Sequence, residues 1–478
     1  MIARRTKTAV VIGAGPAGLA AAGLLQRRGV ATTVVEQNPQ TGGLSQTFKM
    51  GAYRYDIGGH RFFTPDTEIH DFVVSTLGAE GVWVDRTSHI YQDGRFFDYP
   101  LSAINAAVGI GPTGMARAAG SLVWYRLLNA AGMLDLTTFE GWTQARFGDN
   151  LYRRFFGDYT EKVWGVSCKR LSADWARQRI RDLSLSKAIF DALTRTPAKN
   201  GPATLLKKFL YPRLGIGQLS QLMANEFVQA GGDLRLNSRV VGVESSDDRV
   251  LRVVLDDGQT IEGEQFLFTN PLPQTAAWLG ARRKDLQGIR YRGIMTVFLT
   301  FKRNQVTTDN WIYFPDKNVP FGRMHEPRNW SRAMAPDGHT SLVVEYFAFP
   351  HDPSWERTDA DLIEDTVSRL EKMGFVQRRE FESGEVRRLP NAYPLYEIGY
   401  EARVAELYRR IEEWRNVEVV GRTGMFRYHN IDHAIRTGWE GAKVALGERG
   451  DPFAVNQAGH YHEDGRHGVV GSEGEREV

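Results

Sequence analysis

The sequence is short of the residues that many catalytic and metal-binding sites require. It contains one cysteine, Cys168, among 478 residues, which excludes an intramolecular disulfide framework and a cysteine-rich metal site. It also lacks a G-x-S-x-G nucleophile elbow, an H-E-x-x-H helix and any cluster of ligands at metal-binding spacing. We therefore expect no metal site, and we interpret Cys168 as a packing residue. The reactive atom must then come from a bound cofactor.

The sequence also has little net charge and no long apolar run free of charged residues. The 60 lysines and arginines nearly balance the 57 aspartates and glutamates, so charge gives no case for nucleic acid binding. The apolar run after Arg4-Arg5 is only a strand long and has no signal cleavage site, so we expect a cytoplasmic protein. The stretch 101–134 has few charges, but Pro112 and Arg117 interrupt it, so we predict no membrane span. Amphipathic helices are the favoured interpretation there, and a membrane-facing surface is the alternative.

A strand–turn–helix pattern opens the chain. A short apolar run leads into Gly13-Ala-Gly15-Pro-Ala-Gly18 and a helix, and a second apolar run ends on Glu36. Backbone N–H groups at such a helix start bind a pyrophosphate. Gly13 permits the turn, Gly15 lets the phosphates approach, and Gly18 lets the helix pack on the strand. Glu36 is placed to accept hydrogen bonds from the adenosine ribose. The pattern predicts a dinucleotide, without separating FAD from NAD.

Two further motifs distinguish FAD from NAD. Residues 42–45 read Gly-Gly-Leu-Ser, and residues 56–60 read Asp-Ile-Gly-Gly-His. Both resemble motifs of the flavoprotein superfamily that contains amine oxidases, protoporphyrinogen oxidase, Rab GDP-dissociation inhibitors and UDP-galactopyranose mutases. The resemblance implies FAD, and it places these residues beside the cofactor: Gly43, Ser45, Gly58, Gly59 and His60.

Apolar periodicity predicts an α/β protein with a discontinuous, Rossmann-type FAD-binding domain. Apolar residues at helical spacing dominate residues 99–204, which predicts a helical substrate domain. Alternating apolar residues dominate residues 286–390, which predicts an antiparallel-sheet substrate domain. The polar, glycine- and histidine-rich end is predicted to be disordered. The expected divisions are 1–98 with 205–285 and 391–450 for the FAD domain, 99–204 for the helical domain, 286–390 for the sheet domain and 453–478 for the tail.

Motifs along nearly the whole chain resemble one branch of the superfamily, the UDP-galactopyranose mutases, especially the eukaryotic type. They are the 56–60 loop, Lys162-Val-Trp164 followed by Trp175 and Arg179, Trp311-Ile-Tyr313 with Arg323, Tyr393-Pro394, and the segment 421–433. The resemblance implies that His60, Arg179 and Arg323 are catalytic. It implies further cofactor contacts from Val240, Arg422 and Asp432. The substrate-binding residues that it implies are Tyr99, Trp164, Arg179, Tyr313, Arg323, Tyr393, Tyr428 and Asn430.

The residue types suit a nucleotide-sugar ligand. Its diphosphate carries two negative charges, which Arg179 and Arg323 could grip with forked, charge-assisted bonds. Trp164 either lines the pocket or is a core aromatic residue, and the sequence leaves both open. A helix that begins near Asp432 would direct its positive end at the flavin and favour an anionic reduced form.

The resemblance also implies a reaction, which is the pyranose/furanose isomerisation of a nucleotide-diphosphate sugar. N5 of reduced FAD attacks the anomeric carbon and expels the nucleoside diphosphate, and the sugar recloses through a different hydroxyl. NAD(P)H or another reductant is needed only to activate the flavin. Ser102 and Thr160 stand where the eukaryotic mutases carry Gln and Asn, and the motif at Tyr428 is two residues shorter. The nucleobase and the sugar therefore stay unassigned.

Two other functions remain open. An FAD-dependent oxidase or desaturase would take a hydride from a small or polycyclic substrate, and it predicts an apolar pocket without paired arginines. A binding protein similar to the GDP-dissociation inhibitors would keep the fold without using the flavin. The intact glycine turn and Glu36 argue against the binding protein, and Arg179 with Arg323 argues against the oxidase.

Overall fold

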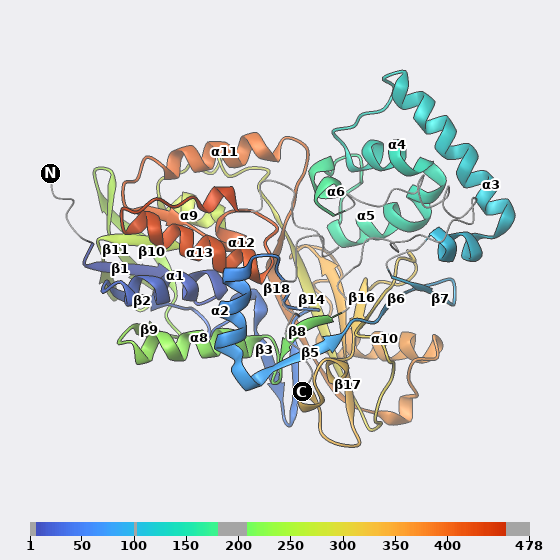
Figure 1. The fold of residues 1–478 in the computed structure, drawn as a ribbon, viewed down its shortest axis with the longest axis horizontal. Coiled ribbons are helices and arrows are strands. Elements are labelled where there is room, and N and C mark those ends of the chain that lie inside the picture. The colour runs from blue at the N-terminus through green and yellow to red at the C-terminus, as the bar shows by residue number, and fades with distance from the viewer. Residues whose placement is uncertain (1–5, 100–102, 180–207, 456–478) are drawn as a thin grey trace, which may run out of the picture.

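A parallel sheet of five strands forms the centre of one half of the molecule (Figure 1). The computed structural model describes residues 6–99, 103–179 and 208–455, with the backbone alone at 103–110, 112, 178 and 179. The strand order is β19-β13-β1-β2-β9. The strands are β1 (Thr8–Ile12), β2 (Ala31–Val35), β9 (Asp233–Arg235), β13 (Gln265–Phe268) and β19 (Val417–Val419).

Both faces of this sheet are buried, which explains why its strands are apolar runs. Along β1, Ala9 and Val11 face one core, whereas Val10 and Ile12 face the other. The first core is covered by α1 (Pro16–Arg27), α2 (Thr67–Leu77), α8 (Gly217–Gln229) and α13 (Ile431–Ala445). The second is covered by β10 (Val240–Ser246), β11 (Arg249–Leu255), β12 (Thr260–Glu262), α9 (Leu272–Trp278) and α11 (Tyr400–Ile411).

A second sheet, with seven strands, forms the other half. Its order is β18-β14-β17-β16-β15-β6-β7, and every pairing is antiparallel except β6 with β15. The strands are β6 (Ser88–Gln92), β7 (Arg95–Asp98), β14 (Tyr291–Phe301), β15 (Trp311–Tyr313), β16 (Arg323–His325), β17 (Thr340–Ala348) and β18 (Phe381–Pro394). α10 (Asp359–Lys372) packs on this sheet. β14 and β17 are buried along their whole length.

The seven-stranded sheet favours another position for one predicted boundary. Residues 1–98 were expected to belong to the FAD-binding domain, but β6 and β7 pair with the substrate sheet. The partner of β6 is more than two hundred residues away in the sequence, so local periodicity carries no sign of it. We therefore propose a domain boundary before Ser88.

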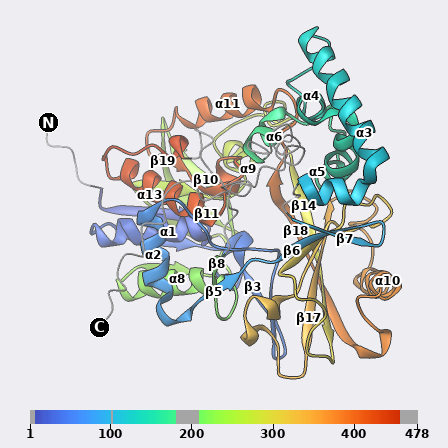
Figure 2. The ribbon, with the colours of Figure 1, turned by 45° about the vertical axis from the view of Figure 1, so that its right-hand side comes forward.

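The helical part stands at the end of the molecule farthest from the parallel sheet (Figures 1 and 2). It contains α3 (Ala103–Ala130), α4 (Phe139–Leu151), the π-helical η3 (Tyr152–Gly157), α5 (Asp158–Trp164) and α6 (Ala173–Arg179). Within residues 6–99, 103–179 and 208–455, no helix has both the length and the apolar composition needed to cross a bilayer. The predicted disordered tail lies outside the described residues from 456 onward.

Short elements join the two halves. They are the hairpin β3 (Thr47–Met50) with β4 (Tyr53–Asp56), the antiparallel pair β5 (Gly81–Asp85) with β8 (Lys208–Pro212), and α12 (Gly421–Gly424). The predicted α/β architecture, with a parallel sheet, a helical insertion and an antiparallel sheet, is confirmed.

Close packing of α13 on α1 gives a stability prediction. A Cβ atom at Gly438 would lie 2.2 Å from the carbonyl oxygen of Ala17, whereas one at Gly120 in α3 would meet nothing within 4 Å. We expect Gly438→Ala to lower the free energy of unfolding by about 1–3 kcal/mol through overpacking. The control Gly120→Ala should raise it by up to about 1 kcal/mol, because alanine favours a helix. Urea unfolding followed by circular dichroism measures both, and equal stability of the two variants would contradict this packing.

Candidate functional site

A cavity of about 1250 Å³ lies between the two sheets and the helical part. One end is formed by residues that follow β1 and β2, and the other by β14, β16, β17 and β18 together with α4, η3 and α5. Ligands of open α/β sheets bind at the carboxyl ends of the strands, as the first end does. Because residues of both halves line the cavity, one end can hold a cofactor and the other a substrate.

The cofactor end is a cradle of bare backbone. Gly13 has φ +103°, and a Cβ there would lie 2.1 Å from Oγ1 of Thr269, so only glycine fits this turn. Gly15 and Gly43 face each other across the cavity wall, since a Cβ on Gly43 would lie 3.4 Å from the Cα of Gly15. The start of α1 follows directly. This bare backbone at a helix N-terminus fits a pyrophosphate.

Glu36 lies at the end of β2 and lines the same cavity. Its Oε2 accepts a hydrogen bond from the backbone N–H of Ala14 at 2.9 Å, and its Oε1 accepts from the backbone N–H of Asn38 at 2.9 Å. These bonds fix the carboxylate against the phosphate turn. Oε1 also accepts from the side-chain amide of Asn38 at 2.6 Å, so Oε2 is the oxygen that keeps a lone pair with which to accept from a ribose hydroxyl.

Asp56 anchors the start of the Gly58-Gly59-His60 loop. Its carboxylate accepts from Oγ1 of Thr47 and the hydroxyl of Tyr211, each at 2.6 Å. Burial raises the pKa of Asp56 to about 6, although these hydrogen bonds oppose the rise. These hydrogen bonds hold Asp56 in place at the end of β4, so the start of the loop has a defined position.

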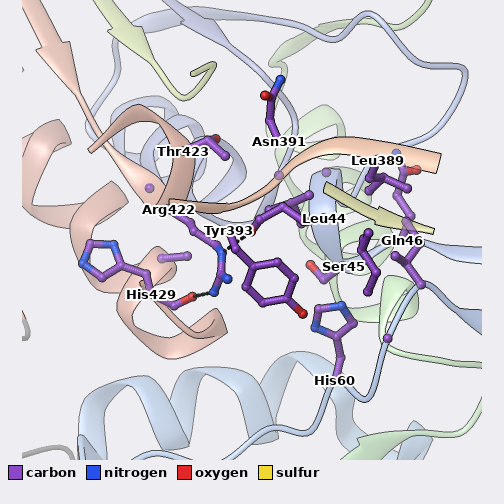
Figure 3. A pocket seen from close by; sticks show the side chains of 18 of the residues that line it. Leu44, Ser45, Gln46, His60, Leu389, Asn391, Tyr393, Arg422, Thr423 and His429 are labelled. Carbon is purple, nitrogen blue, oxygen red and sulfur yellow. Dashed lines mark hydrogen bonds between the residues drawn. The ribbon is translucent and has the colours of Figure 1, made fainter. Parts of the chain in front are cut away.

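His60 projects into the cavity at the end of that loop (Figure 3). Burial lowers the pKa of His60 to about 4, and the nearby cations Arg422 and Arg323 add to this while Glu345 opposes it. The imidazole is therefore neutral near pH 7. A neutral ring can lie against a flavin without bringing a charge to it.

Glu345 connects this loop to the predicted substrate arginine. The side chain is 1% exposed. Its Oε1 accepts from the backbone N–H of Gly59 at 3.3 Å, and its Oε2 accepts from Nε of Arg323 at 2.9 Å and also from Nη2. Burial raises the pKa of Glu345, but Arg323 and His325 outweigh it and hold the pKa at about 2. The ionised carboxylate therefore fixes Arg323 and balances its charge.

Arg323 and Arg422 converge on Tyr393. Nη2 of Arg323 donates to the Tyr393 hydroxyl at 3.0 Å, and burial raises the pKa of that hydroxyl to about 12. The Arg422 guanidinium lies 5.0 Å from the Tyr393 ring and 4.0 Å from the Tyr428 ring. It donates to the carbonyl oxygens of Ala392 and His429. Figure 3 shows the Tyr393 hydroxyl directed towards His60.

The substrate end has a wall of tyrosines and a wall of larger apolar rings. The Tyr313 ring lies 4.6 Å from Tyr99 and 5.8 Å from Tyr159, measured between centroids. The helical part contributes Phe139, Phe155, Phe156 and Trp175. This end therefore offers hydroxyl groups on one side and apolar contact on the other.

Most of the predicted site residues line the cavity. They are Gly13, Gly15, Glu36, Gly43, Ser45, Gly58, Gly59, His60, Tyr99, Val240, Tyr313, Arg323, Tyr393, Arg422, Tyr428 and Asn430. Gly18 lies behind the phosphate turn, where a Cβ would meet the carbonyl oxygen of Gly13 at 2.0 Å. Asp432 is buried behind Asn430 and Ile431, which line the cavity in its place. Arg179 ends α6, and its side chain lies outside the described residues.

Trp164 corrects one expectation. It is 1% exposed, and its ring packs edge-on against Trp175 at 4.8 Å. Trp175, not Trp164, reaches the cavity. The structure thus favours the core interpretation of Trp164, which supports the wall from behind. Both tryptophans have apolar neighbours in the sequence, so the sequence does not show which of them faces inward.

Glu345 and Tyr159 are among the cavity residues that were missed from the sequence. Glu345 is the single acid in the apolar strand Ser341-Leu-Val-Val-Glu-Tyr-Phe, and a carboxylate in such a run is a sign of a buried ion pair. Tyr159 stands next to Thr160, and nothing in its local pattern distinguishes it from a core tyrosine.

Curated proteins with similar sequences are oxidoreductases. The chain is 33% identical to a 1-hydroxycarotenoid 3,4-desaturase of Flavobacterium sp. over 21% of its own length and 22% of that protein. It is 27% identical to a phytoene dehydrogenase of Streptomyces griseus over 57% of its length and 55% of that protein. It is 21% identical to coproporphyrinogen III oxidase of Staphylococcus aureus over 85% of its length and 92% of that protein. The chain thus spans about a fifth and about half of the first two relatives.

Solved structures with this fold include a reduced UDP-galactopyranose mutase, with a TM-score of 0.80 and 23% identity over 92% of this chain and 96% of the other. They also include a putative protoporphyrinogen oxidase from Exiguobacterium sp., with a TM-score of 0.70 and 17% identity over 92% of this chain and 99% of the other. At these identities the likeness shows the fold alone. The family model "Flavin containing amine oxidoreductase" matches residues 16–446. The chain therefore belongs to the family of flavin-containing amine oxidoreductases.

Proposed function

We propose that this flavoenzyme interconverts the pyranose and furanose forms of a nucleotide-diphosphate sugar, with its FAD in the reduced state. The observation that supports this most is the convergence of Arg323 and Arg422 on Tyr393, in a cavity that continues from the phosphate cradle. Guanidinium and tyrosine hydroxyl groups are suitable partners for a diphosphate. The fold shared with a reduced UDP-galactopyranose mutase is consistent with the proposal.

FAD binding follows from the family, and the residues of the cofactor end fit it. The pyrophosphate would bind between Gly15 and Gly43, the adenosine near Glu36 and Val240, and the flavin beside His60 and the start of α13. Reduced FAD would supply the nucleophilic nitrogen, so the reaction requires no protein nucleophile. The protein then has to bind, orient and shield the substrate.

The ion pair with Glu345 limits how Arg323 could bind a phosphate. Because Glu345 balances its charge and uses Nε and Nη2, we expect a phosphate to bind at Nη1. Arg422 donates its bonds to carbonyl oxygens, so its charge is not balanced in that way. The attraction for a dianion would then come mainly from Arg422 and from Arg179. Arg323 would chiefly set the position of the diphosphate.

A second candidate function is hydride transfer from a small or polycyclic substrate to oxidised FAD. The aromatic side chains of the helical wall, Phe139, Phe155 and Phe156, favour it, because they give an apolar ligand a surface to bury. The oxidase and desaturase relatives also support it. Under this alternative, the paired arginines would serve the cofactor alone.

The reaction itself separates the two functions. Purified holoprotein incubated with a panel of nucleotide sugars should form a ring isomer only after reduction with dithionite. Chromatography of the released sugars detects it, and Gly120→Ala serves as a variant that should behave like the wild type. Turnover that consumes oxygen or a redox dye, with no isomer formed, would reject the mutase and favour hydride transfer.

Arg323→Lys tests the contact with the diphosphate. Lysine keeps a positive charge beside Glu345. Its single ammonium group lacks the planar fork with which the guanidinium of arginine can donate to Glu345, Tyr393 and a phosphate at the same time. We expect the Kd for UDP, measured by calorimetry, to rise at least about tenfold, because bonds to charged groups contribute about 1.5–3 kcal/mol. Arg179→Ala should weaken binding in the same assay.

Arg378→Lys is the matched control, because Arg378 forms a similar fork with Glu364 on the exposed surface. Its UDP affinity should equal that of the wild type. If Arg323→Lys also binds UDP as tightly as the wild type, while all variants retain their flavin, Arg323 does not contact the diphosphate.

His60 gives a pH prediction. Since its pKa is about 4, the imidazole stays neutral from about pH 5 to 8, the range in which an exposed histidine titrates. We expect His60→Asn to lower kcat without moving the pH at which activity falls. A fall in wild-type activity near pH 6.5 that disappears in His60→Asn would show instead that His60 titrates during turnover.

A further inference from the structure

The outer side of α3 exposes a group of large apolar side chains. Val123, Trp124 and Leu127 are each 59% exposed, and Met133, just after the helix, is 70% exposed. We call these four residues the α3 apolar face. Solvent-facing sides of helices normally carry polar residues, and a contiguous apolar group of this kind marks a contact surface.

A cationic pocket adjoins this face. It has a volume of about 550 Å³ and is lined by Arg117, Ser121, Asp149, Asn150, Arg153 and Arg154. Asp149 accepts from Nε of Arg153 at 2.8 Å, so the one acid of the pocket is paired within it. Residues 117, 121 and 124 recur at helical spacing and share one side of α3. Arg117 therefore lies on the same side of α3 as Trp124, about two turns away.

The stretch of sequence that contains α3 carries charge of one sign. Between Asp98 and Asp135 the sequence has no acidic residue, and its only charges are Arg117 and Arg126. The apolar face and its arginines complement a surface that is apolar inside and anionic outside, because the acid of the adjoining pocket, Asp149, is paired with Arg153.

The position of α3 leaves this face accessible. In both views α3 is at the outer edge of the helical part, at the end of the molecule away from the parallel sheet (Figures 1 and 2). η3 connects it to the main cavity, because Arg153 and Arg154 line the cationic pocket while Phe155 and Phe156 line the large one. A partner bound here would lie next to the helical wall of the candidate site.

We propose that the α3 apolar face and the arginine pocket dock the protein on the surface of a bilayer that contains anionic lipids. The apolar side chains enter the boundary between headgroups and acyl chains, where tryptophan is favoured. The arginines bind headgroup phosphates through charge-assisted bonds. This docking goes beyond the proposed function and does not rest on it.

A second copy of the chain is a less suitable occupant. A two-fold contact through α3 would bring Arg117 and Arg126 of one copy near the same helix of the other. That helix carries no acid in its sequence to pair with them. Anionic headgroups supply the missing charge.

Vesicle sedimentation tests the proposal. The full-length holoprotein should pellet with vesicles of phosphatidylcholine and phosphatidylglycerol in equal parts, should stay in solution with phosphatidylcholine alone, and should be released by salt. Trp124→Glu combined with Leu127→Glu should weaken binding at least about tenfold, since it puts two charges into the apolar boundary. Arg117→Gln should weaken it about fivefold.

Trp83→Glu is the control, because Trp83 is 56% exposed on β5, outside the helical part. It should bind vesicles like the wild type, and flavin content should be equal in all variants. Wild-type protein that does not pellet with the anionic vesicles would overturn the proposal, as would unchanged binding by the Trp124/Leu127 variant. If light scattering shows that this variant converts a dimer to a monomer, the face is an interface between copies instead.

Discussion

The buried carboxylate of Glu345 sets the geometry of the candidate site. It binds the loop of His60 through a backbone N–H and holds Arg323 through two nitrogens of the guanidinium. The loop extends from the half that binds the cofactor, and Arg323 belongs to the seven-stranded sheet. One ionised group thus relates the two ends of the cavity. Both members of the ion pair lie in the seven-stranded sheet, where removing one partner of a buried pair costs about 3–5 kcal/mol, so the carboxylate is a firmly held acceptor for the loop.

The same carboxylate explains how an oxidoreductase fold could serve a substrate with two negative charges. A free pair of arginines under a reduced flavin would attract any anion. Glu345 balances the charge of Arg323, so under the proposed function the tyrosine hydroxyls would carry much of the substrate recognition. The aromatic wall from the helical part then decides the shape of what can bind. Family membership indicates the cofactor, whereas under the proposed function these side chains would favour isomerisation over hydride transfer.

Local chemistry made part of this structure predictable. The turn at Gly13 and Gly15 and the position of Glu36 follow from strand, turn and helix geometry, whereas the His60 loop was predicted from its resemblance to a flavoprotein motif, and these residues line the cavity. Contacts between distant segments were not predictable. β6 pairs with β15, and Glu345 meets a loop nearly three hundred residues before it. The choice between Trp164 and Trp175 depends on the rotation of short helices, which apolar composition does not specify.

The strand order of the parallel sheet has a consequence for how the chain folds. β1 at the start of the chain pairs with β13, and β13 pairs with β19 at residues 417–419. α13, which covers β1 and α1, follows later still. A ribosome must therefore have released residues 417–419 before the fifth strand can join the sheet, and such long-range pairings form slowly. Cavity residues that follow β19, Arg422 and Tyr428 among them, reach their places only after that step, so a ligand that contacts them stabilises a fold that is nearly complete.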